Sequence, residues 1–167
     1  MIRMAVANDA QQIAEIHVQS WKETYTGIIK PEVLDNLSVP KRLELWQQII
    51  PHLDHQLFVY EKDGKILGFL DGYLNPNSNI AEIRAFYLLK NIQGEGIGRA
   101  MFEKFHQLIH PQKHQILRLE VINKNPSRYF YEKMGGQAVG EEDASDLGVG
   151  ITEVLYQWEI GYNSHKN

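Results

Sequence analysis

The chain has 167 residues, 43% apolar and 23% charged, which is long enough for one domain with a buried core. Its formal net charge of −4 argues against a nucleic-acid binder, because such proteins usually present a basic surface. The chain has no cysteine, no run of eighteen apolar residues and no apolar leader in MIRMAVANDA, which excludes disulfides and thiolate metal sites and favours a cytoplasmic protein without a membrane span.

The first fifty residues predict a short strand and two helical regions. Residues 2–6 are a strand candidate, and Asp9 is placed to cap a helix that continues to about Lys22. A second helical region covers residues 31–50, where Pro40 is expected to divide it.

The next segment predicts strands. Residues 57–60 and 66–70 are apolar and flank an Asp63-Gly64 turn, which is typical of a β-hairpin. A polar loop at 75–79 precedes another apolar strand at 80–89.

The C-terminal half alternates helices and strands. Residues 97–109 have helical periodicity and precede Pro111, and residues 126–134 form a second helix that ends at two glycines. Residues 150–160 are the last strand. Residues 116–122 alternate strictly, with Leu117, Leu119 and Val121 on one face and Arg118 and Glu120 on the other.

The order β-α-α-β-β-β-α-β-α-β-β predicts a mixed α+β fold with helices on the faces of a sheet. We expect residues 1–160 to form a single domain and residues 161–167 to be a C-terminal tail.

A glycine-rich segment joins the strand at 80–89 to the helix that follows it. Gly94, Gly96 and Gly98 alternate with other residues, so backbone N–H groups can approach a bulky anion closely. The helix adds its unpaired N–H groups and the positive end of its dipole. The segment therefore predicts a phosphate-binding loop, with a purely structural loop as the alternative.

The spacing of the glycines shows which of the known phosphate-binding motifs this segment matches. The chain has no GxxxxGK[ST] string, and Arg99 stands where a Rossmann fingerprint has its third glycine. Glu120 lies at about the distance of a ribose-binding acid, so a dinucleotide-binding enzyme stays an alternative. The remaining fit is Gln-x-x-Gly-x-Gly, met by Gln93, Gly96 and Gly98, and it resembles the acyl-CoA pyrophosphate loop of the GNAT N-acetyltransferase superfamily.

A second segment supports the same resemblance. Residues 125–135, NPSRYFYEKMG, are similar to the N-P-x-R-x-F-Y-E-x-x-G segment of that family, and the order of elements is that of the GNAT fold. The resemblance implies a central, mostly antiparallel sheet of about seven strands flanked by about four helices. It also implies that the strand before the glycine loop and the next strand splay apart, with pantetheine in the gap.

The resemblance further implies acetyl-CoA as co-substrate and a set of residues that bind it. The backbone of the strand before the loop would pair with pantetheine as if with another strand. Asn125 would bond to the pantetheine arm, although an Asn before a Pro also caps a helix. The implied cofactor-binding residues are Phe86, Tyr87, Leu88, Gln93, Gly94, Glu95, Gly96, Ile97, Gly98, Arg99, Asn125 and Tyr131.

Two catalytic roles follow from the family and from pKa values. An alkylamine with a pKa near 10.4 costs roughly 4–5 kcal/mol to deprotonate at pH 7, so a general base is expected, either directly or through water. Glu82 is the candidate, because it lies where some family members carry a catalytic glutamate. Tyr131 matches the tyrosine that protonates the leaving thiol in the family.

The acceptor side is expected at the N-terminal helices. Trp21 and Tyr25 lie in the region that forms the acceptor wall in this family, and their pattern loosely resembles that of small-amine and polyamine acetyltransferases. Arg84 would lower the pKa of Glu82 or bind an anionic group of the substrate. Lys90, Arg99, Lys124, Arg128 and Lys133 are the cations near the cofactor segments.

We therefore predict direct transfer of an acetyl group from acetyl-CoA to a primary amine of a small molecule, with a peptide N-terminus or lysine as other acceptors. The alternative from another class is a non-catalytic acyl-CoA sensor or interaction module. No metal is expected at His106, His110 and His114, because Pro111 breaks the helix between them and no cysteine or paired acid supports a site, and we interpret these histidines as surface residues. The family also suggests a homodimer.

Overall fold

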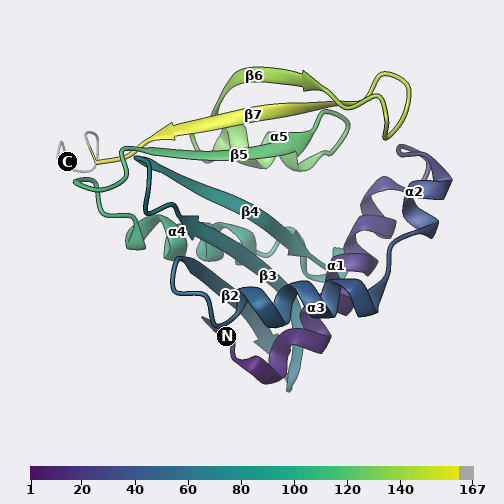
Figure 1. Ribbon diagram of the computed structural model, residues 1–167, viewed down its shortest axis with the longest axis horizontal. Helices are drawn as coiled ribbons and strands as arrows, with labels where there is room; N and C mark the ends of the chain where they lie inside the picture. Colours follow the sequence, from purple (N-terminus) through teal and green to yellow (C-terminus); the bar gives the residue numbers. More distant parts are fainter. Residues whose placement is uncertain (162–167) are drawn as a thin grey trace.

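A computed structural model describes residues 1–161, so the expected tail, apart from its first residue, lies outside the described part of the chain. Within this range one sheet of seven strands is flanked by five α-helices and two 3₁₀ turns (Figure 1). In chain order the elements are β1 (Ile2–Met4), η1 (Ala7–Asp9), α1 (Ala10–Tyr25), α2 (Pro31–Asp35), α3 (Val39–Ile49), β2 (His55–Lys62), β3 (Lys65–Leu74), β4 (Ile80–Leu88), η2 (Lys90–Ile92), α4 (Ile97–Leu108), β5 (Ile116–Ile122), α5 (Ser127–Lys133), β6 (Gln137–Asp143) and β7 (Thr152–Glu159).

The sheet is antiparallel except at its centre. Its strand order is β1-β2-β3-β4-β5-β7-β6, and only β4 and β5 run parallel. These two strands pair at three positions, from Ile80 opposite Ile116 to Glu82 opposite Arg118, and then separate. Figure 1 shows them close together at one end and wide apart at the end that faces α1. The mostly antiparallel sheet and its splayed central strands confirm the predicted fold class.

Apolar clusters cover both faces of the sheet. On one face, α1 and α3 bury Ile13 and Trp46 against Phe69 of β3. On the other face, α4 and α5 bury Phe105 and Tyr131 among strand side chains. Residues of β4 belong to both clusters, so β4 is packed from both faces, whereas β5 packs against the α4 and α5 side.

Several sequence predictions agree closely with the structure. The strand at 116–122 has the predicted bounds, and Leu117, Leu119 and Val121 are all buried. The hairpin turn has positive φ at Asp63 (53°) and Gly64 (77°), as a tight two-residue turn requires.

The N-terminal helices differ from the prediction in two respects. Asp9 occupies the position before α1, but its carboxylate accepts from the N–H of Val6 (2.7 Å) and pairs with Arg3 (2.8 Å) instead of capping the helix. Pro40 does not divide the second helical region, because the break lies at residues 36–38 and Pro40 sits in the first turn of α3. A proline is tolerated there since that N–H would have no helical acceptor.

No helix in residues 1–161 is long and apolar enough to cross a membrane.

Candidate active site

A cavity of about 520 Å³ lies at the end of β4, between the glycine loop and the start of α5. Its wall combines the end of β4, the glycine loop, the start of α4 and the segment that begins α5. The predicted cofactor residues on this wall are Phe86, Leu88, Gln93, Gly94, Gly96, Gly98, Arg99, Asn125 and Tyr131. Tyr87, Glu95 and Ile97 were also predicted, but their side chains do not line this cavity.

The glycine loop is open toward the cavity. Gly94 and Gly96 have φ values of +80° and +82°, and an added Cβ at either position would meet no atom within 4 Å. Gly96 is also the residue before α4, so no side chain covers the first turn of that helix. The side-chain amide of Gln93 donates to the carbonyl of Leu88 (2.9 Å) and thereby ties the loop to the end of β4.

The start of α4 supplies donors for an anion. Ile97, Gly98 and Arg99 form the first turn, whose N–H groups have no acceptor within the helix. The N–H of Gly96 likewise has no backbone acceptor in the described residues. Lys90 also lines the cavity, which adds a second cation beside Arg99. Together these groups suit a phosphate or diphosphate.

The other predicted cations lie elsewhere. Lys124, Arg128 and Lys133 do not line the cavity. Arg128 instead donates to the hydroxyl of Tyr156 (3.1 Å) and the carbonyl of Asn123 (3.1 Å), which is a structural role.

The edge of β4 is free on the cavity side. Beyond Glu82 the strand has no partner toward β5, while its other side continues to pair with β3 as far as Leu88. An unpaired strand edge presents N–H and C=O groups that an extended ligand can match. The residues from Ile83 to Leu88 are therefore a ready surface for a ligand with amide groups.

Tyr131 of α5 stands on the wall with a polar group that lacks a partner. The residue is only 6% exposed, and its hydroxyl has no hydrogen bond with any described residue. Burial, followed by the nearby Tyr87 and Tyr25, raises the pKa of the Tyr131 phenol, so the group stays protonated at neutral pH. Because Tyr131 lines the cavity, its protonated phenol is available there as a proton donor.

A second cavity of about 240 Å³ meets the first one at shared walls formed by Phe86, Asn125 and Tyr131. The predicted acceptor residues Trp21, Tyr25 and Arg84 all line it.

Hydrogen bonds hold the side chains of this second wall in place. The indole N–H of Trp21 donates to the hydroxyl of Tyr87 (2.8 Å), and the amide of Asn125 donates to the hydroxyl of Tyr25 (2.9 Å). The other end of the Asn125 amide accepts from the N–H of Ser127 (2.9 Å), so Asn125 does stabilise the start of α5.

Glu82 lines neither cavity. Its carboxylate accepts from the guanidinium of Arg84 at 3.0 Å, and its backbone is the last position at which β4 pairs with β5. The structure thus places Glu82 at the edge of the opening and not on its wall.

Three acidic residues on the cavity walls were not predicted for this site. Glu120 and Glu153 line the second cavity. Hydrogen bonding to Glu153, then burial, then the charges of Glu153 and Glu82 raise the pKa of Glu120. Glu23 of α1 lines the larger cavity with one carboxylate oxygen, Oε1, buried and unpartnered among the described residues. Glu120 lies on the polar face predicted for its strand, and the sequence suggested it only as a ribose-binding acid.

The histidines do not form a metal site in the described residues, where no group of three or more potential ligands comes together. His114 is not a surface residue as predicted: it is buried, and its Nε2 lies 2.8 Å from the carbonyl of Asn75.

Comparison with known proteins agrees with this architecture. Residues 22–159 match the family model described as an acetyltransferase (GNAT) domain. The chain is 29% identical over 160 residues to the uncharacterized N-acetyltransferase YuaI of Bacillus subtilis (strain 168), covering 94% of this chain and 91% of YuaI.

Two further relatives come from Thermoplasma acidophilum. Its spermidine N(1)-acetyltransferase is 25% identical over 161 residues, which is 93% of this chain and 97% of that protein. The crystal structure of the PaiA N-acetyltransferase from that organism, in complex with coenzyme A, superposes with a TM-score of 0.80 at 22% identity, covering 95% of this chain and 98% of the other.

Proposed function

The chain belongs to the GNAT acetyltransferase family, and on this premise we propose that it transfers the acetyl group of acetyl-CoA directly to a primary amine of a small molecule. The observation that carries the proposal is the continuous wall from the glycine loop, along the free edge of β4, to the unpartnered hydroxyl of Tyr131. We take residues 1–160 as the catalytic unit.

The residues present fit acetyl-CoA along its length. We assign the diphosphate to the open glycine loop, where Gly94 and Gly96 leave room and the N–H groups of α4 point outward. We assign the amide-bearing arm to the free edge of β4, since amides can pair with strand N–H and C=O groups. The backbone φ of Gly96 is positive, and any residue with a Cβ would adopt this conformation only at a cost in free energy. Glycine therefore suits this position.

We propose that Tyr131 protonates the thiol as it leaves. A thiol has a reference pKa near 8.5 and a tyrosine near 10, so donation is uphill by roughly 2 kcal/mol in water. Burial raises the pKa of the Tyr131 phenol further, which makes the donor weaker. The same dry surroundings destabilise a thiolate, so the proton moves as negative charge develops on sulfur.

We assign the acceptor amine to the second cavity, which reaches Tyr131 from the side of α1. Trp21 and Tyr25 form an aromatic wall there, with ring centroids 4.9 Å apart. A volume of about 240 Å³ suits an alkyl chain with an amine at its end better than a folded polypeptide segment. The related spermidine acetyltransferase supports a small amine, and a peptide terminus or lysine is the less favoured acceptor.

For Glu82 we propose an indirect part in amine activation. Its carboxylate is paired with Arg84 and lies outside both cavities, but its negative charge contributes to raising the pKa of Glu120. A direct role as general base stays a prediction that Glu82→Gln tests.

Calorimetric titration with acetyl-CoA tests the proposal. The wild type should bind, and Gly96→Glu should not, because the new carboxylate would enter the anion site and repel the diphosphate. Gly64→Glu is the matched control, since Gly64 has the same sign of φ (+77°) and equal free space but lies in the β2–β3 turn. Equal loss of binding in both variants would assign the effect to backbone strain.

Turnover then separates the enzyme from the alternatives. The wild type should acetylate spermidine or another alkylamine, and Tyr131→Phe should keep its affinity for acetyl-CoA while kcat falls by about 10² or more. Binding of acetyl-CoA without acetylation of any amine would instead favour an acyl-CoA sensor. Binding of NAD(P)H without acetyl-CoA would favour a dinucleotide enzyme. The homodimer stays a prediction that light scattering tests.

A further inference from the structure

Two carboxyl groups from different strands meet on the wall of the second cavity. Glu120 lies on β5 opposite Leu155, and Glu153 lies on β7 opposite Ile122, so the two residues are diagonal neighbours on one face of the sheet. The two side chains also line the same cavity, and the proximity of Glu153 raises the pKa of Glu120. Two adjoining carboxyl groups form an acidic site that can hold a cation and accept a proton from it.

Neither Glu120 nor Glu153 forms an ion pair within residues 1–161. Arg84 is the cation on this wall, but its guanidinium is held by Glu82 (3.0 Å) and lies 3.8 Å above the ring of Tyr73.

A second observation points independently to a missing ligand at this place. Tyr131 is only 6% exposed, its hydroxyl has no hydrogen-bond partner among the described residues, and the residue lines both cavities where they meet. A hydroxyl on a side chain this buried normally forms a hydrogen bond, because leaving one unmade costs free energy. The cavity therefore has an uncompensated negative pair along its wall and an unused donor at its inner end.

We propose that Glu120 and Glu153 together bind a protonated alkylamine in the second cavity and accept the proton that this amine loses before it attacks. This inference rests on the proposed function and names the acceptor as a cationic amine. A neutral or acidic acceptor would leave the pair without its counter-charge.

The proton and electron balance is simple. The ammonium group gives one proton to the carboxylate oxygen of the pair and becomes a neutral amine. The nitrogen lone pair then forms the C–N bond to the acetyl carbonyl, and the C–S bond breaks. The sulfur takes the proton of Tyr131, and the nitrogen, which must lose a second proton to become an amide, returns one to the phenolate.

The groups that face the pair fix its pH dependence. They are Glu82 and Arg84 from β4, Glu142 from β6, which lies opposite Glu153, and the neutral phenols of Tyr25, Tyr87 and Tyr131. Hydrogen bonding to Glu153, burial, and the charges of Glu153 and Glu82 raise the pKa of Glu120, which makes Glu120 a stronger base than an isolated glutamate. As the pH falls through that raised pKa, Glu120 becomes protonated and activity toward alkylamines should decline.

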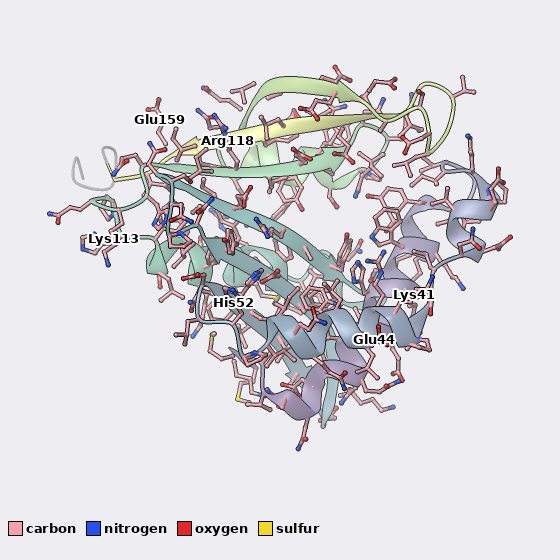
Figure 2. All side chains as sticks on the ribbon, in the orientation of Figure 1. Lys41, Glu44, His52, Lys113, Arg118 and Glu159 are labelled. Carbon is pink, nitrogen blue, oxygen red and sulfur yellow. The ribbon has the colours of Figure 1, made fainter. Side chains whose placement is uncertain are left out.

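The test compares Glu120→Gln and Glu153→Gln with Glu159→Gln. Glu159 is an exposed carboxylate on the same strand as Glu153, outside both cavities, and Figure 2 shows it at the closed end of the sheet near Arg118. We expect kcat/KM for spermidine to fall by about 10² or more in each of the first two variants, while Glu159→Gln stays within about threefold of the wild type. The acid limb of the kcat/KM profile should also move in the two affected variants.

Two binding measurements accompany the kinetics. Calorimetric titration of spermidine into the coenzyme A complex should show affinity weakened by about tenfold or more in Glu120→Gln and Glu153→Gln. Acetyl-CoA affinity should be unchanged, because neither residue lines the larger cavity. Urea unfolding confirms that each variant is folded.

Wild-type kinetics and spermidine affinity in both glutamine variants would overturn the inference. If the enzyme still bound acetyl-CoA and acetylated amines, the proposed function would stand and only the role of the pair would fail. If only Glu82→Gln lost activity, the role of Glu120 and Glu153 would likewise be refuted, and Glu82 of β4 would be the general base.

Discussion

Lowering the pH from 7 to 5 should destabilise the folded protein through one buried histidine. His17 of α1 is 7% exposed, and its Nδ1 accepts a hydrogen bond from the indole N–H of Trp46 (3.2 Å). The imidazole also stacks on the ring of Tyr87, with centroids 5.2 Å apart. Burial, and then the charge of Arg42, lower the pKa of His17 from 6.5 to about 3.

The sign and size of the effect follow from linkage. Below pH 6.5 the unfolded chain binds a proton at His17, whereas the folded protein does not until about pH 3. The contribution of neutral His17 to stability is therefore fully present above pH 6.5 and is lost progressively as the pH falls toward 3. At pH 5 the loss is 1.5 pH units at about 1.4 kcal/mol each, or about 2 kcal/mol.

Urea unfolding of the wild type and His17→Gln at both pH values measures this loss. Glutamine cannot titrate, yet its carbonyl can still accept from Trp46, so the variant keeps the contact and loses the pH dependence. Carboxylates that titrate in both proteins cancel in the difference. His110→Gln removes an exposed imidazole and controls for the loss of a histidine as such. If His17→Gln lost as much stability between pH 7 and pH 5 as the wild type, the reasoning would be refuted.

Two further substitutions test the packing that supports the site. Gly72→Ala on β3 should lower the free energy of unfolding by about 1–3 kcal/mol, because the new Cβ would lie 2.2 Å from the ring of Phe105. An unchanged urea midpoint would mean that the Phe105 ring can move aside freely. Tyr87→Phe should lower the free energy of unfolding by about 1 kcal/mol, because it removes the acceptor of the Trp21 indole N–H (2.8 Å). It should also raise KM for the amine more than KM for acetyl-CoA, and an equal rise in both constants would contradict a role confined to the second cavity.

The sequence predicted the fold wherever local chemistry dominates. The strict alternation of residues 116–122 identified that strand and its buried face, because one face of the strand packs on α4 and α5. The helix break was misplaced because Pro40 fits the first turn of a helix as well as it breaks one, and Ser38 supplies the actual cap by accepting from the N–H of Lys41 (3.3 Å).

The site was predictable in part for the same reason. The glycine loop and the segment after β5 carry local patterns, and the structure brings them to one cavity. The meeting of Glu120 with Glu153 depends instead on the register of β5 against β7, which no local pattern records. Glu82 was predicted from the family resemblance, with Arg84 as its neighbour, and the two side chains do pair (3.0 Å). That Glu82 lies outside both cavities is not visible in the local pattern.

The short ladder between β4 and β5 makes this junction the most easily bent part of the sheet. Strands β1 to β4 form one panel and strands β5 to β7 another, and three residue pairs are the whole ladder between them. An elongated ligand bound along the free edge of β4 would stabilise the junction between these two parts of the sheet. The protein with a ligand bound would then be stiffer between β4 and β5 than the empty protein. Release of the product would make this junction flexible again, so that the next pair of substrates can enter.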